Sequence, residues 1–266
     1  MAKNFVYVGS WLDDNKNNGG LRLYEQDSMT GELKFVEEYV KDLAVGSLCI
    51  SPDRKYLYAL DEIKRKPGRI SCGGSVYAFA IDQDSGRLAY INSIPTAGAF
   101  PCYITIDSTG RYLLAVNYGS EDVTIRYVQD DNGSYVLQHS FDEASAVVIR
   151  TGNNGRLDGI ADLARIEGTP SKAYEYFQSS PHPHSINIDP SDDFALITDR
   201  GCDQLIMYRL DRSSGKLARA DILRTKKRCR PAQFSIPSYS AVFLCRLRTD
   251  ALCHRLQVRP ANREDI

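Results

Sequence analysis

Ile50-Ser-Pro-Asp-Arg-Lys-Tyr-Leu-Tyr-Ala-Leu-Asp-Glu62 and Ile106-Asp-Ser-Thr-Gly-Arg-Tyr-Leu-Leu-Ala-Val-Asn-Tyr118 are near copies of one pattern. A third copy, Ile188-Asp-Pro-Ser-Asp-Asp-Phe-Ala-Leu-Ile-Thr-Asp-Arg200, follows after a longer interval. In each copy a polar turn leads into a short apolar strand, and units of this kind that repeat along a chain are typical of β-propeller blades. The repeat therefore predicts an all-β fold, a β-propeller.

A second element recurs in the units, a hairpin turn that carries Asp, small polar residues and a Gly before an apolar residue. The clear copies are Asp27-Ser-Met-Thr-Gly-Glu-Leu33, Asp82-Gln-Asp-Ser-Gly-Arg-Leu88 and Asp211-Arg-Ser-Ser-Gly-Lys-Leu217, and residues 127–136 form a degenerate fourth. Glycine permits the positive φ that such a turn needs, and Asp can bond the turn backbone. The two elements together predict an incomplete propeller domain over residues 1–228, with about four to five blades legible.

The spacing of the copies also predicts an insertion. The third and fourth units are separated by a stretch at about residues 141–180, with a candidate short helix at 171–177. A long loop on one face of a propeller serves either as a rim over the central channel or as surface decoration.

The composition is ordinary for a globular chain. Of 266 residues, 42% are hydrophobic and 25% are charged, and the formal net charge is −1. Because no basic field dominates, we expect neither nucleic acid nor a membrane surface as partner. No leader pattern or membrane-length apolar run is present, so a cytoplasmic location is expected. The seven cysteines form no Cys-x-x-Cys pair, which favours scattered thiols in a reducing compartment over a zinc site.

Two of the four histidines lie together in Pro181-His-Pro-His-Ser-Ile-Asn-Ile-Asp-Pro190. The strand that begins here is expected to be the innermost of its blade, which places its first residues at the mouth of the central channel. His184 is therefore a candidate general base or acid near neutral pH, and His182 a candidate substrate ligand. The alternative for both is a histidine that bonds its own loop. We predict no metal site at this pair.

The repeated strands end in polar residues that equivalent positions would gather around one rim, where a small polar substrate could be held. These residues are Asp61 and Glu62, Asn117 and Tyr118, and Asp199 and Arg200. We take Glu62, Asn117, Tyr118, Asp199 and Arg200 as candidate substrate ligands; the alternative is that they only cap their strands. The basic loop at residues 64–69 is either a solvated turn or an attractor for an anion such as a sugar phosphate.

The pattern stops before the chain does. From Arg224 to Ile266 there is no glycine, and Arg becomes abundant while the Asp/Gly turns disappear. One hypothesis is an altered reading frame, because codons for Cys229-Arg-Pro-Ala232, read one base later, can encode Ala-Gly-Pro. The alternative is a genuine C-terminal tail over residues 229–266 with a short amphipathic helix around residues 251–258.

Four stretches together resemble the propeller-type lactonase family, which contains 6-phosphogluconolactonases and carboxymuconate cyclases. They begin at Tyr7, Ser51, Asp107 and Pro181, and the resemblance covers roughly residues 4 to 228. It implies a seven-bladed propeller without an obligatory metal or other cofactor, and a lactone-opening or lactone-forming site in the central channel. By this resemblance the family histidine is His184. The family's Gly-Pro-Arg-His and Asn-Glu motifs have no counterpart in the tail, although the one-base shift would restore Gly-Pro-Arg.

The resemblance implies hydrolysis of a sugar lactone, with 6-phosphogluconolactone opened to 6-phosphogluconate in the oxidative pentose phosphate route as the first candidate. The partners implied are a small-molecule sugar lactone or sugar phosphate. A muconate-type lactonising cyclase and a non-catalytic binding propeller are the alternatives. With blades missing and a sheet edge left open, the chain as given is expected to be poorly soluble or inactive.

Overall fold

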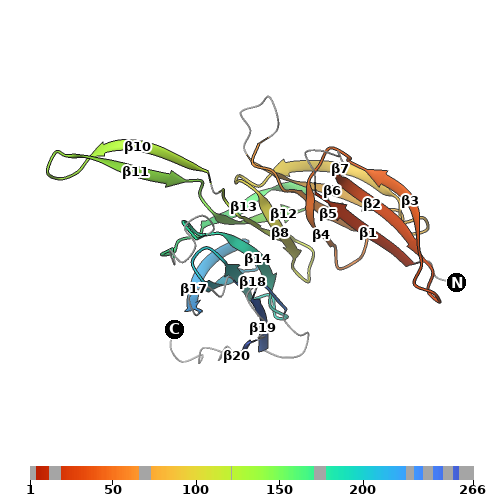
Figure 1. The fold of residues 1–266 in the computed structure, drawn as a ribbon. Helices are drawn as coiled ribbons and strands as arrows, with labels where there is room; N and C mark the ends of the chain where they lie inside the picture. The colour runs from red at the N-terminus through yellow and green to blue at the C-terminus, as the bar shows by residue number, and fades with distance from the viewer. Residues whose placement is uncertain are drawn as a thin grey trace.

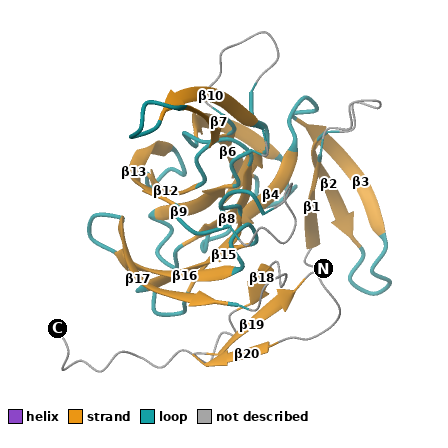
Figure 2. Cartoon of the chain, turned by 60° about the vertical axis from the view of Figure 1, so that its left-hand side comes forward, coloured by secondary structure: helices purple, strands orange, loops and turns teal. Residues whose placement is uncertain are grey.

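The computed structural model describes residues 4–11, 19–65, 73–120, 122–170, 178–225, 231–235, 242–247 and 254–257. Within these ranges the secondary structure consists of antiparallel strands, without a helix (Figures 1 and 2). The strands form successive sheets in chain order, each connected to the next by a loop. In the part of the chain that the structure describes, no helix is long and apolar enough to cross a membrane.

Three sheets have four strands each, and neighbouring strands in each sheet follow the order of the chain. In the middle one of the three, a separate two-stranded hairpin lies in the chain between the second and third strands. The second sheet of the chain contains β4 (Val45–Ile50), β5 (Tyr56–Asp61), β6 (Ser75–Ile81) and β7 (Leu88–Pro95). The third contains β8 (Pro101–Ile106), β9 (Tyr112–Asn117), β12 (Ser145–Thr151) and β13 (Leu157–Arg165). The fourth contains β14 (Pro183–Ile188), β15 (Phe194–Asp199), β16 (Gln204–Asp211) and β17 (Lys216–Arg224).

The first and last sheets have three strands each. The first contains β1 (Asn4–Ser10), β2 (Gly20–Gln26) and β3 (Leu33–Tyr39). The last contains β18 (Pro231–Ser235), β19 (Val242–Leu247) and β20 (His254–Gln257). Residues 254–257 are therefore strand, which contradicts the amphipathic helix considered for residues 251–258.

A polar residue at the start of each repeat fixes the turn between the first and second strands of its sheet; it is Ser51 in the first copy and Asp in the next two. Oδ1 of Asp107 accepts the backbone N–H groups of Arg111 and Tyr112, both at 2.8 Å. Oδ1 of Asp189 accepts the backbone N–H of Phe194 at 2.8 Å in the same way. A carboxylate that bonds turn N–H groups satisfies donors that the short turn leaves unpaired, which is why the residue type recurs.

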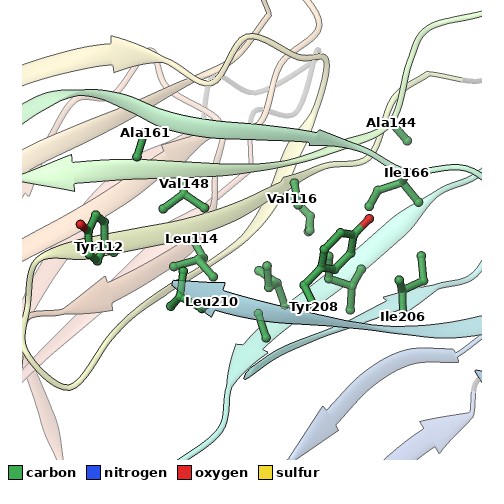
Figure 3. Close-up of a cluster of buried hydrophobic side chains, with 14 residues drawn as sticks. Tyr112, Leu114, Val116, Ala144, Val148, Ala161, Ile166, Ile206, Tyr208 and Leu210 are labelled. Carbon is green, nitrogen blue, oxygen red and sulfur yellow. The ribbon is translucent and has the colours of Figure 1, made fainter. Parts of the chain in front are cut away.

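The sheets pack face to face around their first strands. β4 lies beside β8, β8 beside β14, and β14 beside β18. Between the third and fourth sheets, Leu114 and Val116 of β9 meet Ile206 and Leu210 of β16 in a cluster of buried side chains (Figure 3). Each such fully buried aliphatic side chain contributes about 1.5–3 kcal/mol. Strands buried on both faces explain the continuous apolar runs of the repeat.

One hairpin lies outside this sheet pattern, and it shows that the insertion expected at about residues 141–180 was misplaced. β10 (Val123–Gln129) and β11 (Tyr135–Phe141) pair only with each other and project away from the sheets (Figure 1). The degenerate fourth turn belongs to this hairpin. The insertion expected at about 141–180 was misplaced, because β12 and β13 fall in that range and complete the third sheet, with Ser145 opposite Asn117. The candidate helix at 171–177 lies outside the described residues.

Candidate active site

A cavity of about 410 Å³ opens beside the inner strands. It is lined by Trp11, Glu62, Phe100, Tyr118, Ser120, His184 and Arg200. Four of these residues come from equivalent positions, since each directly follows the strand that precedes a Gly-turn hairpin: Trp11 follows β1, Glu62 follows β5, Tyr118 follows β9 and Arg200 follows β15. Four successive sheets thus each present one chemically different side chain to the same space.

In the second, third and fourth sheets, the residue just before this position is buried and bonds the protein itself. Oδ1 of Asp61 accepts the backbone N–H of Ala44 at 3.0 Å. Nδ2 of Asn117 donates to the Thr96 carbonyl at 3.0 Å and to the Ser145 hydroxyl at 2.9 Å. These side chains hold loops and strand ends, so the structure separates Asn117 from the cavity although it was a candidate ligand.

Asp199 is buried like Asp61 and Asn117, and its carboxylate accepts more hydrogen bonds. Its Oδ1 accepts the backbone N–H groups of His182 at 2.8 Å, Gly201 at 2.9 Å and Cys202 at 3.3 Å, and its Oδ2 accepts Nε2 of Gln204 at 2.8 Å. Burial raises the pKa of Asp199 above its usual value, against the lowering effect of these donors. Asp199 is absent from the residues that line the cavity.

The two histidines are placed differently. His184 lines the cavity from β14, at an irregularity in the pairing between Pro183 and Ser185. His182 is fully buried, and its ring stacks on Tyr118 with centroids 4.4 Å apart. Nδ1 of His182 lies 3.1 Å from the Tyr118 carbonyl, and burial lowers the pKa of His182. A neutral His182 therefore supports Tyr118 from behind and does not line the cavity.

Tyr118 connects the polar groups of the cavity wall. Its ring meets the His184 ring edge to face, with centroids 6.2 Å apart. The guanidinium carbon of Arg200 lies over the same ring, 5.7 Å from its centroid. An imidazole and a guanidinium held against one aromatic ring have limited freedom, which orients both toward a common ligand.

Glu62 is the acidic group of the cavity. Nε1 of Trp11 donates a hydrogen bond to Oε2 of Glu62 at 3.0 Å. Burial raises the pKa of Glu62 from 4.5 to about 7, against the opposing effect of the Trp11 hydrogen bond. Gly46, at the position of β4 that corresponds to Cys102 and His184, has no side chain, and a Cβ there would overlap Oε2 of Glu62. The missing side chain makes room for the carboxylate.

Three lining residues were not predicted: Trp11, Phe100 and Ser120. Trp11 was detectable, because it follows Tyr7-Val-Gly-Ser10 just as Glu62 follows its strand. The position of Phe100 in the cavity wall could not be predicted from the sequence, because it depends on a left-handed backbone conformation with φ of 51°. Ser120 depends on a tertiary contact, a hydrogen bond from Nζ of Lys64 at 3.0 Å.

Lys64 begins the basic loop that was weighed as an anion attractor. Its Nζ pairs with the carboxylates of Asp122 at 2.9 Å and Asp142 at 2.7 Å, at the base of the β10–β11 hairpin. This cation is therefore engaged by the protein's own acids. Residues 66–72 of the same loop lie outside the described residues. Within the described ranges, no three His, Cys, Asp or Glu side chains gather as metal ligands do.

Antiparallel sheets that pack around their first strands, with a polar cavity at the inner strand ends, define a β-propeller. The model of the family described as lactonase, 7-bladed beta-propeller matches residues 5–133 and 125–231, and the chain belongs to this family. This confirms the predicted fold class and the predicted family.

Curated relatives agree with the family. A 6-phosphogluconolactonase of Formosa agariphila is 23% identical over 232 residues, which are 86% of this chain and 57% of the relative. A 6-phosphogluconolactonase of Bacillus subtilis is 26% identical over 210 residues, which are 79% of this chain and 50% of the relative. The chain thus spans about half the length of the curated relatives it matches.

The structure of a periplasmic gluconolactonase from Pseudomonas aeruginosa superimposes with a TM-score of 0.70 at 20% identity, covering 98% of this chain and 69% of that one. This likeness supports the propeller fold.

Proposed function

We propose that the complete protein hydrolyses a sugar lactone, and that its substrate is 6-phosphogluconolactone, opened to 6-phosphogluconate. The observation that carries the proposal is that His184 and Arg200 line one cavity and both lie against Tyr118. Membership of the lactonase family and the names of the curated relatives support the reaction class.

The cavity supplies the two groups that lactone opening needs. His184 takes a proton from water as the water oxygen attacks the lactone carbonyl carbon. The guanidinium of Arg200 stabilises the negative charge that develops on the carbonyl oxygen. When the tetrahedral intermediate collapses, the ring C–O bond breaks and the leaving alkoxide takes the proton from His184. The product is a hydroxy acid, and His184 is neutral again.

The remaining candidate ligands divide by position. Glu62 and Tyr118 line the same cavity and are proposed to contact substrate. His182, Asn117 and Asp199 are proposed to hold the cavity wall, in place of the substrate contacts expected from the sequence.

The test is an assay of lactone hydrolysis above the spontaneous rate, with the phosphorylated and the unphosphorylated lactone, on the complete protein. His184→Ala should lower kcat by about 100-fold or more, the scale of a lost general base. His139→Ala, on the exposed face of the hairpin, is the matched control and should leave kcat unchanged. Conversion of a muconate to its lactone would assign the cyclase reaction instead. An unchanged rate in His184→Ala would reject His184 as the general base, and hydrolysis at only the spontaneous rate in the unmodified protein would favour the non-catalytic binding platform.

A cytoplasmic location is part of the proposal. It is supported by the three described cysteines, Cys49, Cys102 and Cys202, which are all free thiols, as proteins of a reducing compartment have them. Cell fractionation tests it, and recovery in a periplasmic fraction would contradict it.

A further inference from the structure

One wall of the cavity carries groups that the hydrolysis does not use. Trp11 and Glu62, from the first two sheets, form this wall, whereas His184 and Arg200 come from the fourth sheet. The indole of Trp11 is 58% exposed although it lines a cavity. An exposed Trp whose position is fixed by a hydrogen bond presents a large apolar surface at low cost in side-chain entropy.

The carboxylate of this wall is held in a defined place. Its Oε2 accepts the Trp11 N–H, and the space it fills exists because Gly46 has no side chain. Gly46 has no left-handed backbone that would demand glycine, so the need for glycine here is one of space. Within the described ranges, Oε2 accepts the indole N–H while Oε1 accepts no hydrogen bond, and a carboxylate oxygen is a strong acceptor for hydroxyl groups.

We infer that Trp11 and Glu62 form a sugar-recognition wall, in which the indole packs on the C–H groups of a polyhydroxylated substrate, cyclic or opened, and the carboxylate accepts hydrogen bonds from its hydroxyls. The inference rests on the proposed function, because it assigns the substrate class to the same cavity. Above its pKa of about 7 the ionised Glu62 repels a carboxylate held directly against it, as a muconate would place one there, whereas ring hydroxyls donate hydrogen bonds to it. The wall therefore selects a hydroxylated lactone whose carbonyl points toward His184 and Arg200.

The given chain has one tryptophan, and an emission change that is lost in Trp11→Phe is assigned to position 11 of the complete protein. The experiment titrates the complete protein with gluconate, a polyhydroxy acid that is not turned over, and separately with cis,cis-muconate. We expect gluconate to change the Trp11 emission saturably, also in the His184→Ala background, and muconate to bind more weakly. Glu62→Gln, which keeps the Trp11 hydrogen bond but removes the charge, should reduce the discrimination against muconate.

Gly46→Ala tests how the wall is positioned. The added methyl meets the flexible end of Glu62 and Nε1 of Trp11 at 3.1 Å, both side-chain ends, so the fold should persist while the carboxylate and the indole move and the emission of the unliganded protein shifts. Gluconate binding measured by calorimetry should weaken about tenfold in Gly46→Ala and in Trp11→Ala, the scale of one lost aromatic contact. Tyr127→Ala, 72% exposed on β10, is the matched control and should bind gluconate as the unmodified protein does.

The inference is overturned if gluconate fails to bind by both methods, or if Trp11→Ala binds gluconate and hydrolyses lactone unchanged. In the second case the proposed hydrolysis stands without the wall. Conversely, gluconate binding that depends on Trp11 and Glu62 in a protein that hydrolyses no lactone upholds the wall and rejects the proposed reaction.

Discussion

Neighbouring residues at the ends of the repeated strands differ in what their side chains contact. The anchor positions, Asp61, Asn117 and Asp199, are buried and bond backbone or side-chain groups of the protein. The pocket positions, Trp11, Glu62, Tyr118 and Arg200, follow one residue later and line the cavity. The anchors are chemically alike from sheet to sheet, while the pocket residues are an indole, a carboxylate, a phenol and a guanidinium. A residue type that recurs from sheet to sheet therefore identifies a position that stabilises the fold. The residue that follows it varies between sheets, and this variation identifies a position that contacts a ligand.

The last sheet breaks this rule. In the second, third and fourth sheets the first strand begins opposite the anchor, with Val45, Pro101 and Pro183 paired to Asp61, Asn117 and Asp199. In the last sheet Pro231 is paired to Leu247. Leucine has no acceptor for backbone N–H groups, so the anchor chemistry ends where the Gly-turn pattern ends.

The largest expected effect concerns this break. We propose that the reading frame changes after about residue 228, and that the restored frame places Asp or Asn at the position of Leu247. Protein from the restored frame should unfold cooperatively and hydrolyse lactone, whereas the chain as given should be poorly soluble or inactive, because an open sheet edge exposes unpaired backbone groups. Sequencing of the encoding DNA and a thermal melt of both proteins measure this. Independent reads with the present frame intact, or an active and monodisperse product from it, would refute the proposal.

The second prediction removes an anchor. Asp199→Ala leaves three backbone N–H groups without their buried acceptor, so we expect a loss of about 3–4 kcal/mol in the free energy of unfolding, measured with urea. Asp199→Asn keeps an oxygen in place of Oδ1 and should lose much less. If the two variants were equally stable, the anchor positions would not hold the fold through these hydrogen bonds.

The contrast between the two positions also sets the limits of sequence analysis. The strands, the turn Asp residues and the approach of Glu62, Tyr118, His184 and Arg200 to one rim follow from local pattern and repetition, and so could be predicted. The division between anchor and pocket could not, because Asn117 and Tyr118 are both polar strand-end residues until the pairing shows which one is enclosed. The hairpin at β10–β11 was misread because its turn copies the blade turn, while only long-range pairing of β9 with β12 reveals it.

The third prediction uses the raised pKa of Glu62, about 7 in the folded protein against 4.5 in the unfolded chain. The folded state then holds a proton that the unfolded chain releases, so the contribution of Glu62 to stability is complete below pH 4.5 and is lost as pH rises through 7. His182 acts in the opposite direction, because its pKa is lowered and its contribution grows as pH rises toward 6.5.

The difference between the unmodified protein and Glu62→Gln cancels the effect of His182. We expect the free energy of unfolding of the unmodified protein, relative to that of Glu62→Gln, to fall by about 2–3 kcal/mol between pH 4.5 and 7.5. Urea titrations at four pH values across this window measure it. A difference that stays constant with pH would mean that Glu62 is solvated and ionised throughout, as an ordinary surface carboxylate is.

The smallest effect is expected from a change of shape at constant charge. Arg200→Lys keeps a cation at the pocket position but loses the planar guanidinium that lies over Tyr118. Because we propose that Arg200 stabilises the oxyanion, kcat should fall about tenfold on the phosphorylated and unphosphorylated lactones alike, with KM nearly unchanged. A loss confined to the phosphorylated lactone and expressed in KM would assign Arg200 to the phosphate instead. An equal loss of unfolding free energy in Arg200→Lys and Asp199→Ala would erase the distinction between pocket and anchor, since position 200 would then hold the fold as position 199 does.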